Sequence, residues 1–135
     1  MNSRMDRFVA SKAIKYMVQN KVEVSGSKAL ILGIAFKENC PDIRNTKVVG
    51  IVRELEDFGL DVDVCDPLAD KKEVQERLNI TLLDKPKLDK YTLIILAVPH
   101  AIFLNGKEFD FASLSTPIIF DIKAVLPKHI GNIRL

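Results

Sequence analysis

The chain has 135 residues, a length that suits one domain with a single hydrophobic core. Apolar residues make up 47% and charged residues 28%, and no apolar run approaches the roughly 20 residues needed to span a bilayer, which excludes membrane insertion. Twenty Lys and Arg against eighteen Asp and Glu leave a net charge of +2 with the signs interspersed, so neither nucleic acid nor a membrane surface is expected as a partner. Two cysteines, without a secretory signal or a Cys/His cluster, favour the reducing cytoplasm and no metal site.

The first half of the chain is predicted to form a helix, a strand, a second helix and a second strand, in that order. Apolar residues recur at helical spacing between about Asp6 and Asn20, which predicts an amphipathic helix. The apolar run 29–32 predicts a strand buried on both faces. Helical spacing returns over 48–58, with Asn45 or Thr46 as the expected N-cap and Gly59 as the residue that ends the helix. The alternating segment 60–65 predicts the second strand, which stops at Asp66-Pro67.

The second half continues the alternation less regularly. A third helix is expected from Asp70, with Glu73 at the capping-box position, to a left-handed turn at Asn79. Segment 80–83 is left open as an edge strand or a packed connection. Residues 93–98 and 117–121 predict two more buried strands, with a weakly helical segment over 109–114 between them. The pattern indicates an α/β fold: a Rossmann-like, doubly wound parallel sheet in three α/β/α layers, preceded by a long helix.

Ligands of such folds bind beyond the carboxyl ends of the strands, which directs attention to four loops. The loop 33–46 keeps one glycine of the dinucleotide fingerprint but carries Lys37 and Arg44 ahead of a helix N-terminus, an arrangement suited to binding phosphates through side chains. The alternative is that Arg44 pairs with Asp42 and that Lys37 is solvated. Lys123 is a further cation at this edge, with a surface salt bridge as its alternative.

Asp66, His100 and Cys40 each have a functional and a structural interpretation, and the structural one is favoured for each. Asp66 stands where a ribose-binding acid would lie, but it is more often a turn former. His100 could titrate near a ligand, but such a histidine is more commonly a hydrogen-bonding structural residue. Cys40 has no neighbour in sequence that would activate it, and Cys65 is expected in the core.

The loop sequence from Gly33 to Thr46, GIAFKENCPDIRNT, resembles the signature of the C-terminal domain of the UDP-glucose/GDP-mannose dehydrogenase family. Other segments of the chain fall where further family motifs fall: the first helix with Asn2, Asp66-Pro67, the Val98-Pro99-His100 turn and Phe120-Asp121-x-Lys123. The resemblance therefore covers essentially the whole chain. The amino-acid sequence of the loop is most similar to that of the branch that oxidises UDP-N-acetylhexosamines for bacterial capsule and surface-polysaccharide synthesis.

The resemblance implies roles for individual residues. Phe36 and Lys37 would contact the UDP-sugar substrate, with Lys37 near its phosphates, and Arg44 would reach NAD that is bound mainly by another domain. Lys123 would lie near a basic position that helps to hold the nucleotide. Some members have a second basic residue beside it, where this chain has Ala124.

The resemblance also implies what the chain lacks. Family members oxidise the C6 alcohol of the sugar to a carboxylate in two NAD-dependent steps, through a thiohemiacetal on a cysteine in a Gly-rich upstream segment. No such segment occurs here, so neither Cys40 nor Cys65 receives a catalytic role, and this chain is expected to be inactive alone. Residues 1–25 would be the end of the central dimerisation helix and residues 26–135 the UDP-sugar-binding domain, which makes a homodimer or higher oligomer the expected state.

Two rival interpretations belong to other functional classes. One is a non-catalytic nucleotide-binding or oligomerisation module, which an upstream G-x-G-x-x-G segment with a Gly-rich cysteine segment would exclude. The other is a receiver-like signalling domain, which the Pro99-His100 sequence after the buried strand disfavours because no phospho-acceptor aspartate follows. The identity of the sugar does not follow from the sequence.

Overall fold

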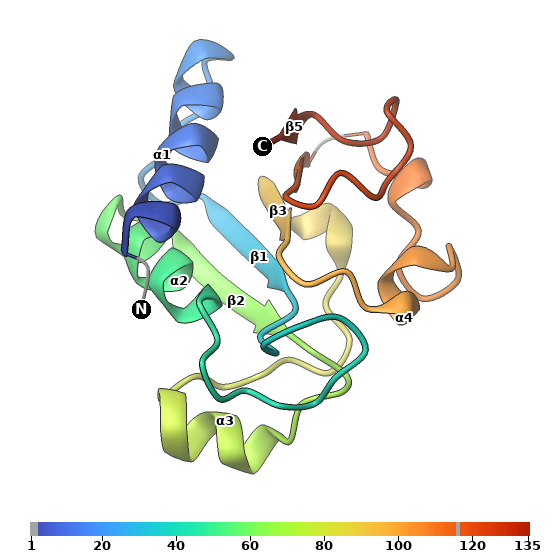
Figure 1. Cartoon of the computed structure of the whole chain (residues 1–135). Helices are drawn as coiled ribbons and strands as arrows, with labels where there is room; N and C mark the ends of the chain where they lie inside the picture. The colour runs from blue at the N-terminus through green and yellow to red at the C-terminus, as the bar shows by residue number, and fades with distance from the viewer. Residues whose placement is uncertain (1–2, 116) are drawn as a thin grey trace.

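The computed structural model describes residues 3–115 and 117–135, which form one five-stranded sheet with helices around it (Figure 1). The helices are α1 (Ser3–Gln19), α2 (Val48–Asp57), α3 (Lys71–Leu78) and α4 (Ala101–Leu104), with 3-10 turns η1 (Leu88–Lys90) and η2 (Phe111–Ser113). The strands are β1 (Lys28–Leu32), β2 (Asp61–Cys65), β3 (Leu93–Leu96), β4 (Ile118–Asp121) and β5 (Ile133–Arg134). The fold class is therefore the expected one, with the long helix first.

All five strands run parallel in the order β2-β1-β3-β4-β5. Leu32 of β1 lies beside Cys65 of β2 and Leu96 of β3, and Leu96 lies beside Asp121 of β4. The carboxyl ends of these four strands consequently meet at one edge of the sheet. The loops that carry the predicted site residues leave from this edge.

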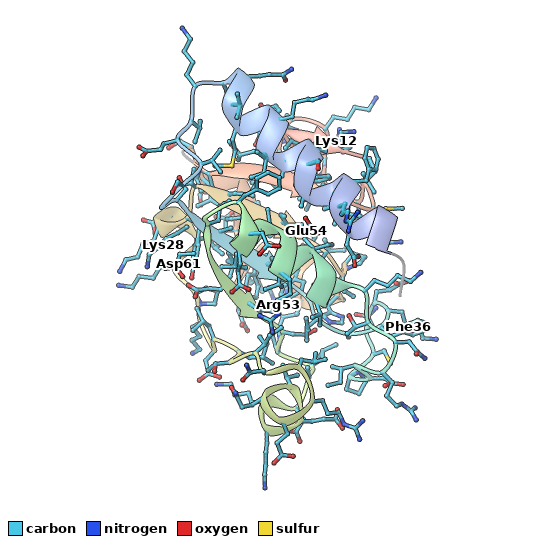
Figure 2. The ribbon with its side chains drawn as sticks, turned by 90° about the vertical axis from the view of Figure 1, so that its left-hand side faces the viewer. Lys12, Lys28, Phe36, Arg53, Glu54 and Asp61 are labelled. Carbon is cyan, nitrogen blue, oxygen red and sulfur yellow. The ribbon has the colours of Figure 1, made fainter. Side chains whose placement is uncertain are left out.

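The two faces of the sheet have different covers. Helices α1 and α2 lie together on one face, where Val9, Ala13 and Met17 of α1 join the main hydrophobic core (Figures 1 and 2). The opposite face is covered by η1, α4, η2 and their connecting loops, with Phe103, Phe109 and Phe111 in a second cluster. Burial on both faces explains the continuously apolar sequences of β1 and β3.

Several predicted details are confirmed and others need correction. Asp70 caps α3 by accepting the N–H groups of Lys72 and Glu73, and Asn79 ends that helix in the left-handed conformation. Gly59, with a φ of 96°, follows α2 as predicted. The predicted N-cap of α2 is wrong by one or two residues: Lys47 holds that position, because Asn45 already turns the chain in the left-handed region.

The least regular part of the chain differs most from its prediction. Segment 80–83, which the sequence left open, forms one parallel bridge between Leu82 and Val64 of β2. Within 109–114 only the 3-10 turn η2 forms, and α4 and β5 were not predicted. Both are short, four and two residues, and their burial depends on contacts with the sheet.

Candidate functional site

A cavity of about 240 Å³ opens beyond the carboxyl ends of β1, β3 and β4, in the position where parallel α/β sheets bind ligands. Helix α1 and the start of α2 form its other walls. Most of the lining is apolar, and the polar and aromatic side chains are few. The lining residues are Met5, Asp6, Val9, Ala35, Phe36, Asn45, Lys47, Val48, Ile51, Ala97, Val98, Ile122 and Lys123.

Two predicted substrate residues, Phe36 and Lys123, meet at this cavity although they are far apart in the sequence. Phe36 follows β1 and is 53% exposed, and Figure 2 shows its side chain at the outer edge of the molecule. Lys123 follows β4 and is also exposed. Its side chain forms no salt bridge within the described part of the chain, so the salt-bridge alternative is not observed. An aromatic ring and an unpaired ammonium group therefore border the same apolar cavity.

The turn that carries Lys123 is organised by the buried carboxylate of Asp121. Its oxygens accept the backbone N–H groups of Val125 and Leu126 at 3.1 and 2.7 Å. Arg134 of β5 donates to the carbonyl of Leu126 at 3.1 Å and lies 3.8 Å from Asp121. These contacts fix both ends of the turn, so the backbone position of Lys123 is set by the sheet.

A second buried carboxylate, Asp66, anchors the start of the loop 33–46. Its Oδ2 accepts the N–H groups of Ile34 and Ala35 at 2.8 and 3.2 Å, and its Oδ1 accepts the N–H group of Leu68 at 2.9 Å. The side chain has no exposed surface, so it cannot bind a ribose. The structural interpretation of Asp66 as a turn former is confirmed.

His100 connects Asp66 to the far side of this loop. Its Nδ1 accepts the Asn39 N–H at 2.8 Å, so its Nε2 carries the proton and donates it to Asp66 Oδ2 at 3.0 Å. Burial raises the pKa of the Asp66 carboxyl, but the hydrogen bonds from His100 and the Ile34 N–H outweigh that effect and hold the pKa below its usual range. His100 is thus a structural residue that fixes the loop over the sheet edge.

Asn39 and Gly33 complete the anchoring. Asn39 adopts a φ of 57°, and its side-chain oxygen accepts the Ala101 N–H at 2.8 Å. Gly33 has a φ of 98°, and a Cβ atom there would lie 2.5 Å from the Cβ atom of Val98. Only glycine permits this close passage of the loop against the end of β3.

The structure places Lys37 and Arg44 away from the cavity lining. Lys37 is exposed beside Phe36. Arg44 forms a bidentate pair with Asp42, at 3.0 Å from Nε to Oδ1 and 2.9 Å from Nη2 to Oδ2, as the alternative interpretation had it. The hydrogen bonds of the Arg44 side chain lower the pKa of Asp42 to about 2. Arg44 borders a separate shallow depression, together with Arg77 and Glu73 of α3.

Sequence reasoning missed two charged residues of the cavity, Asp6 and Lys47. Asp6 lies on the apolar face of α1, three residues before the buried Val9, and it is only 3% exposed. That position is the signal that could have identified it, because a carboxylate on a buried helix face is rare. Burial raises the pKa of Asp6, and the positive charge of Lys47 partly opposes this effect.

The cysteines and possible metal ligands add nothing to the site. Cys65 is buried in the core as expected, and desolvation raises the pKa of its thiol to about 12. Cys40 is half-buried, and its sulfur accepts the Asp42 N–H at 3.5 Å. Among residues 3–115 and 117–135 no group of three or more His, Cys, Asp or Glu side chains has a geometry that would hold a metal ion. No helix in the same residues is long and apolar enough to cross a membrane.

The fold is a Rossmann-like α/β domain, and its cavity lies at the carboxyl edge of a parallel sheet. Residues 30–128 match the family model described as the UDP-glucose/GDP-mannose dehydrogenase family, UDP binding domain. The match covers most of the chain. The chain therefore belongs to this family, as the loop signature indicated.

Curated relatives support the same assignment. Protein CapL of Staphylococcus aureus is 39% identical over 135 residues, which cover 98% of this chain and 32% of that protein. UDP-N-acetyl-D-glucosamine 6-dehydrogenase of Pseudomonas aeruginosa is 37% identical over 137 aligned residues, which cover 100% of this chain and 32% of that protein. The chain thus spans about a third of the length of these relatives.

Solved structures share the fold. An NDP-N-acetyl-D-galactosaminuronic acid dehydrogenase from Methanosarcina mazei superposes with a TM-score of 0.76 at 20% identity, covering 96% of this chain and 27% of that one. A UDP-glucose dehydrogenase from Pyrobaculum islandicum superposes with a TM-score of 0.73 at 22% identity, covering 97% and 30%. At these identities the similarity establishes the architecture alone.

Proposed function

We propose that this chain is the UDP-sugar-binding C-terminal domain of an NAD-dependent nucleotide-sugar 6-dehydrogenase. The full enzyme would oxidise the C6 alcohol of a UDP-sugar, with a UDP-N-acetylhexosamine as the first candidate and UDP-glucose as the second, to a carboxylate for capsule or surface-polysaccharide synthesis in the bacterial cytoplasm. The observation that carries the proposal is the convergence of Phe36 and Lys123 on one cavity in a chain that matches a UDP binding domain. The relatives named for UDP-N-acetyl-D-glucosamine favour the first candidate.

The chemistry of the cavity fits a nucleotide diphosphate. The Lys123 ammonium group, which has no carboxylate partner in the described residues, is available to a phosphate oxygen. The exposed ring of Phe36 offers a flat apolar surface to a base or to a sugar face. Lys37, one residue further along the loop, is exposed outside the cavity lining and is proposed as a further cation for the same ligand. The apolar walls of the cavity would strengthen the contact between the Lys123 ammonium group and the ligand.

NAD would supply the hydride acceptor of this reaction when it is bound. In this chain the residue proposed to touch it is Arg44. Asp42 accepts from its Nε and Nη2, while Nη1 has no acceptor among residues 3–115 and 117–135 and could donate to a phosphate. The guanidinium group of Arg44 is exposed, so it is accessible to a ligand that another domain binds.

Catalysis and assembly are proposed to depend on the rest of the enzyme. Cys40 and Cys65 carry no catalytic role, so this chain should not reduce NAD in the presence of a UDP-sugar. Helix α1 would continue the central helix, with residues 1–25 as its end and residues 26–135 as the binding domain. Exposed apolar side chains on α1, Phe8 at 53% and Val18 at 61%, support association into a homodimer or a higher oligomer, which light scattering would measure.

The proposal is tested by titrating the chain with UDP-N-acetylglucosamine and following backbone amide shifts. Residues around the cavity should shift, and Lys123→Met should weaken binding about tenfold because one charged phosphate contact is lost. Lys72→Met on α3 is the matched control, since Lys72 is also exposed and the substitution removes the same charge. If the two variants bind alike, or if no amide near the cavity shifts, this function is contradicted.

A further inference from the structure

His100 is a fully buried titratable side chain that the function proposed above does not use. Its Nδ1 accepts the Asn39 N–H at 2.8 Å, and its Nε2 donates to Asp66 Oδ2 at 3.0 Å. Imidazole is the side chain whose charge ordinarily changes closest to neutral pH. Since both ring nitrogens are hydrogen-bonded, a change in protonation must change at least one of these two contacts.

The contact with Asn39 fixes one end of the loop segment 36–38. The other end follows Ala35, whose N–H donates to Asp66 Oδ2 at 3.2 Å. Asp66 and His100 are hydrogen-bonded to each other, so one buried pair joins the two ends of the segment. The segment is therefore held over the sheet edge by contacts on both sides.

This segment matters for binding because it carries Phe36, which lines the cavity. The Phe36 N–H donates to the Asp42 carbonyl at 2.7 Å on the opposite side of the loop. The Phe36 side chain is 53% exposed and points to the outer edge of the molecule (Figure 2). Since packing covers only part of this ring, the backbone of the loop largely determines where the ring meets a ligand.

A proton on Nδ1 is incompatible with the contact between His100 and Asn39. Both ring nitrogens would then be donors, so the Asn39 N–H would face a second N–H group. The bond from Nε2 to Asp66 would keep its donor and become charge-assisted on both sides, which holds the ring in place. Asp66 is the one charged group recorded against the imidazole in the described part of the chain, and Phe103 of α4 packs on it with 5.5 Å between ring centroids. The contact that breaks is therefore the one with Asn39.

We propose that His100 is a positioning residue of the nucleotide site: its neutral imidazole holds Asn39, and through the loop Phe36, in the binding position, and a proton on Nδ1 loosens the segment and weakens nucleotide binding. The inference rests on the proposed function, because it concerns the same cavity and the same UDP-sugar. The Asn39 side chain still accepts the Ala101 N–H at 2.8 Å, so the segment loosens without leaving the sheet. If about one molecule in ten then keeps Phe36 in place, the Kd rises about tenfold.

Two substitutions of His100 separate its contact with Asn39 from its contact with Asp66. Asparagine has an oxygen near the position of Nδ1 and does not titrate, so His100→Asn keeps an acceptor for the Asn39 N–H. His100→Leu removes this acceptor, and both variants lose the hydrogen bond to Asp66. At about pH 8, His100→Leu should raise the Kd for UDP-N-acetylglucosamine about tenfold, whereas His100→Asn should raise it by about twofold at most.

The pH profile of the wild-type chain tests the inference without a change at His100. The diphosphate of UDP-N-acetylglucosamine keeps its charge over the range in which imidazole titrates, so the ligand itself contributes no pH dependence. The Kd should rise about tenfold from about pH 8 to about pH 5, while circular dichroism shows that the chain stays folded. His129→Asn is the matched control, because His129 is exposed and is the other histidine of the chain. This control should keep the wild-type profile, and His100→Asn should give a flat one.

The outcomes distinguish this inference from the function on which it rests. If Lys123→Met weakens binding while the wild-type profile is flat, the role of His100 is refuted and the function stands. Equal Kd values for His100→Asn and His100→Leu, or a pH dependence that His129→Asn abolishes, would also overturn the role of His100. No binding of UDP-N-acetylglucosamine at any pH would overturn both proposals.

Discussion

The substitution Asp66→Asn should destabilise the protein strongly although it changes only one atom. Asp66 Oδ2 accepts three hydrogen bonds, from Ile34, Ala35 and His100, and Oδ1 accepts the fourth from Leu68. Asparagine can keep its oxygen at the Oδ2 position, but its NH₂ group then faces the Leu68 N–H. One donor is left unsatisfied, and three charge-assisted bonds become neutral.

The magnitude follows from these four bonds. An unsatisfied buried donor costs about 1–3 kcal/mol, and each of the three weakened bonds loses roughly 0.5–1 kcal/mol, so the loss is about 2.5–6 kcal/mol. An unfolding entropy of about 2.1 cal/mol/K per residue converts 3 kcal/mol into a decrease of roughly 10 °C in the melting temperature of a chain this long.

The assay is thermal unfolding followed by circular dichroism, with Asp70→Asn as the matched control. Asp70 also accepts two backbone N–H groups, but it is exposed and asparagine caps helices as well as aspartate does. Because the folded pKa of Asp66 is lowered, its stabilisation is complete above the ordinary carboxyl pKa and is lost as the pH falls through the folded value. The difference in melting temperature between wild type and Asp66→Asn should therefore become smaller in strong acid. A melting temperature within about 2 °C of wild type at neutral pH would refute the proposed role of the Asp66 network.

Three further predictions address the loop and the thiols. Gly33→Ala should lower the free energy of unfolding, measured in urea, by more than about 3 kcal/mol, because the new Cβ atom would clash with Val98. The control Gly106→Ala should lower it by about 1 kcal/mol, since Gly106 has a φ of 73° but open space around its Cα atom. Equal losses in the two variants would contradict the close packing of Gly33 against Val98. The Asp42 carboxyl should titrate near pH 2 by carbon NMR and return toward its ordinary pKa in Arg44→Ala; an unchanged value in the variant would show that Arg44 is not the cause. Iodoacetamide at pH 8 should label Cys40 and leave Cys65 unmodified until the chain unfolds, because burial raises the Cys65 pKa to about 12; rapid labelling of both would contradict the buried position.

Local sequence signals predicted the elements that have strong periodicity or marked ends. Continuous apolar runs identified β1 and β3, and Asp70 and Asn79 bounded α3 through capping chemistry that involves only near neighbours. The short elements α4 and β5 were missed because four or two residues carry too little periodic signal.

The site was predictable only in part, for a similar reason. Lys123 was identified from its position after a buried strand and from the family resemblance, whereas Phe36 was identified from the resemblance alone. The sheet topology brings the two residues to one cavity. The His100–Asp66 hydrogen bond joins residues 34 positions apart, so no local pattern specifies it. Asp6 and Lys47 likewise become cavity residues only through the packing of α1 against α2. Tertiary contacts, which single-sequence patterns do not encode, supply this part of the site.

The central claim is that the cavity beyond β1, β3 and β4 binds the nucleotide of a UDP-sugar. A crystal structure of this chain with UDP-N-acetylglucosamine tests it most directly. The account predicts the diphosphate within hydrogen-bond distance of the Lys123 ammonium group and the nucleotide against the ring of Phe36. A nucleotide found instead in the depression beside Arg44 and Arg77, with the cavity empty, would contradict the claim.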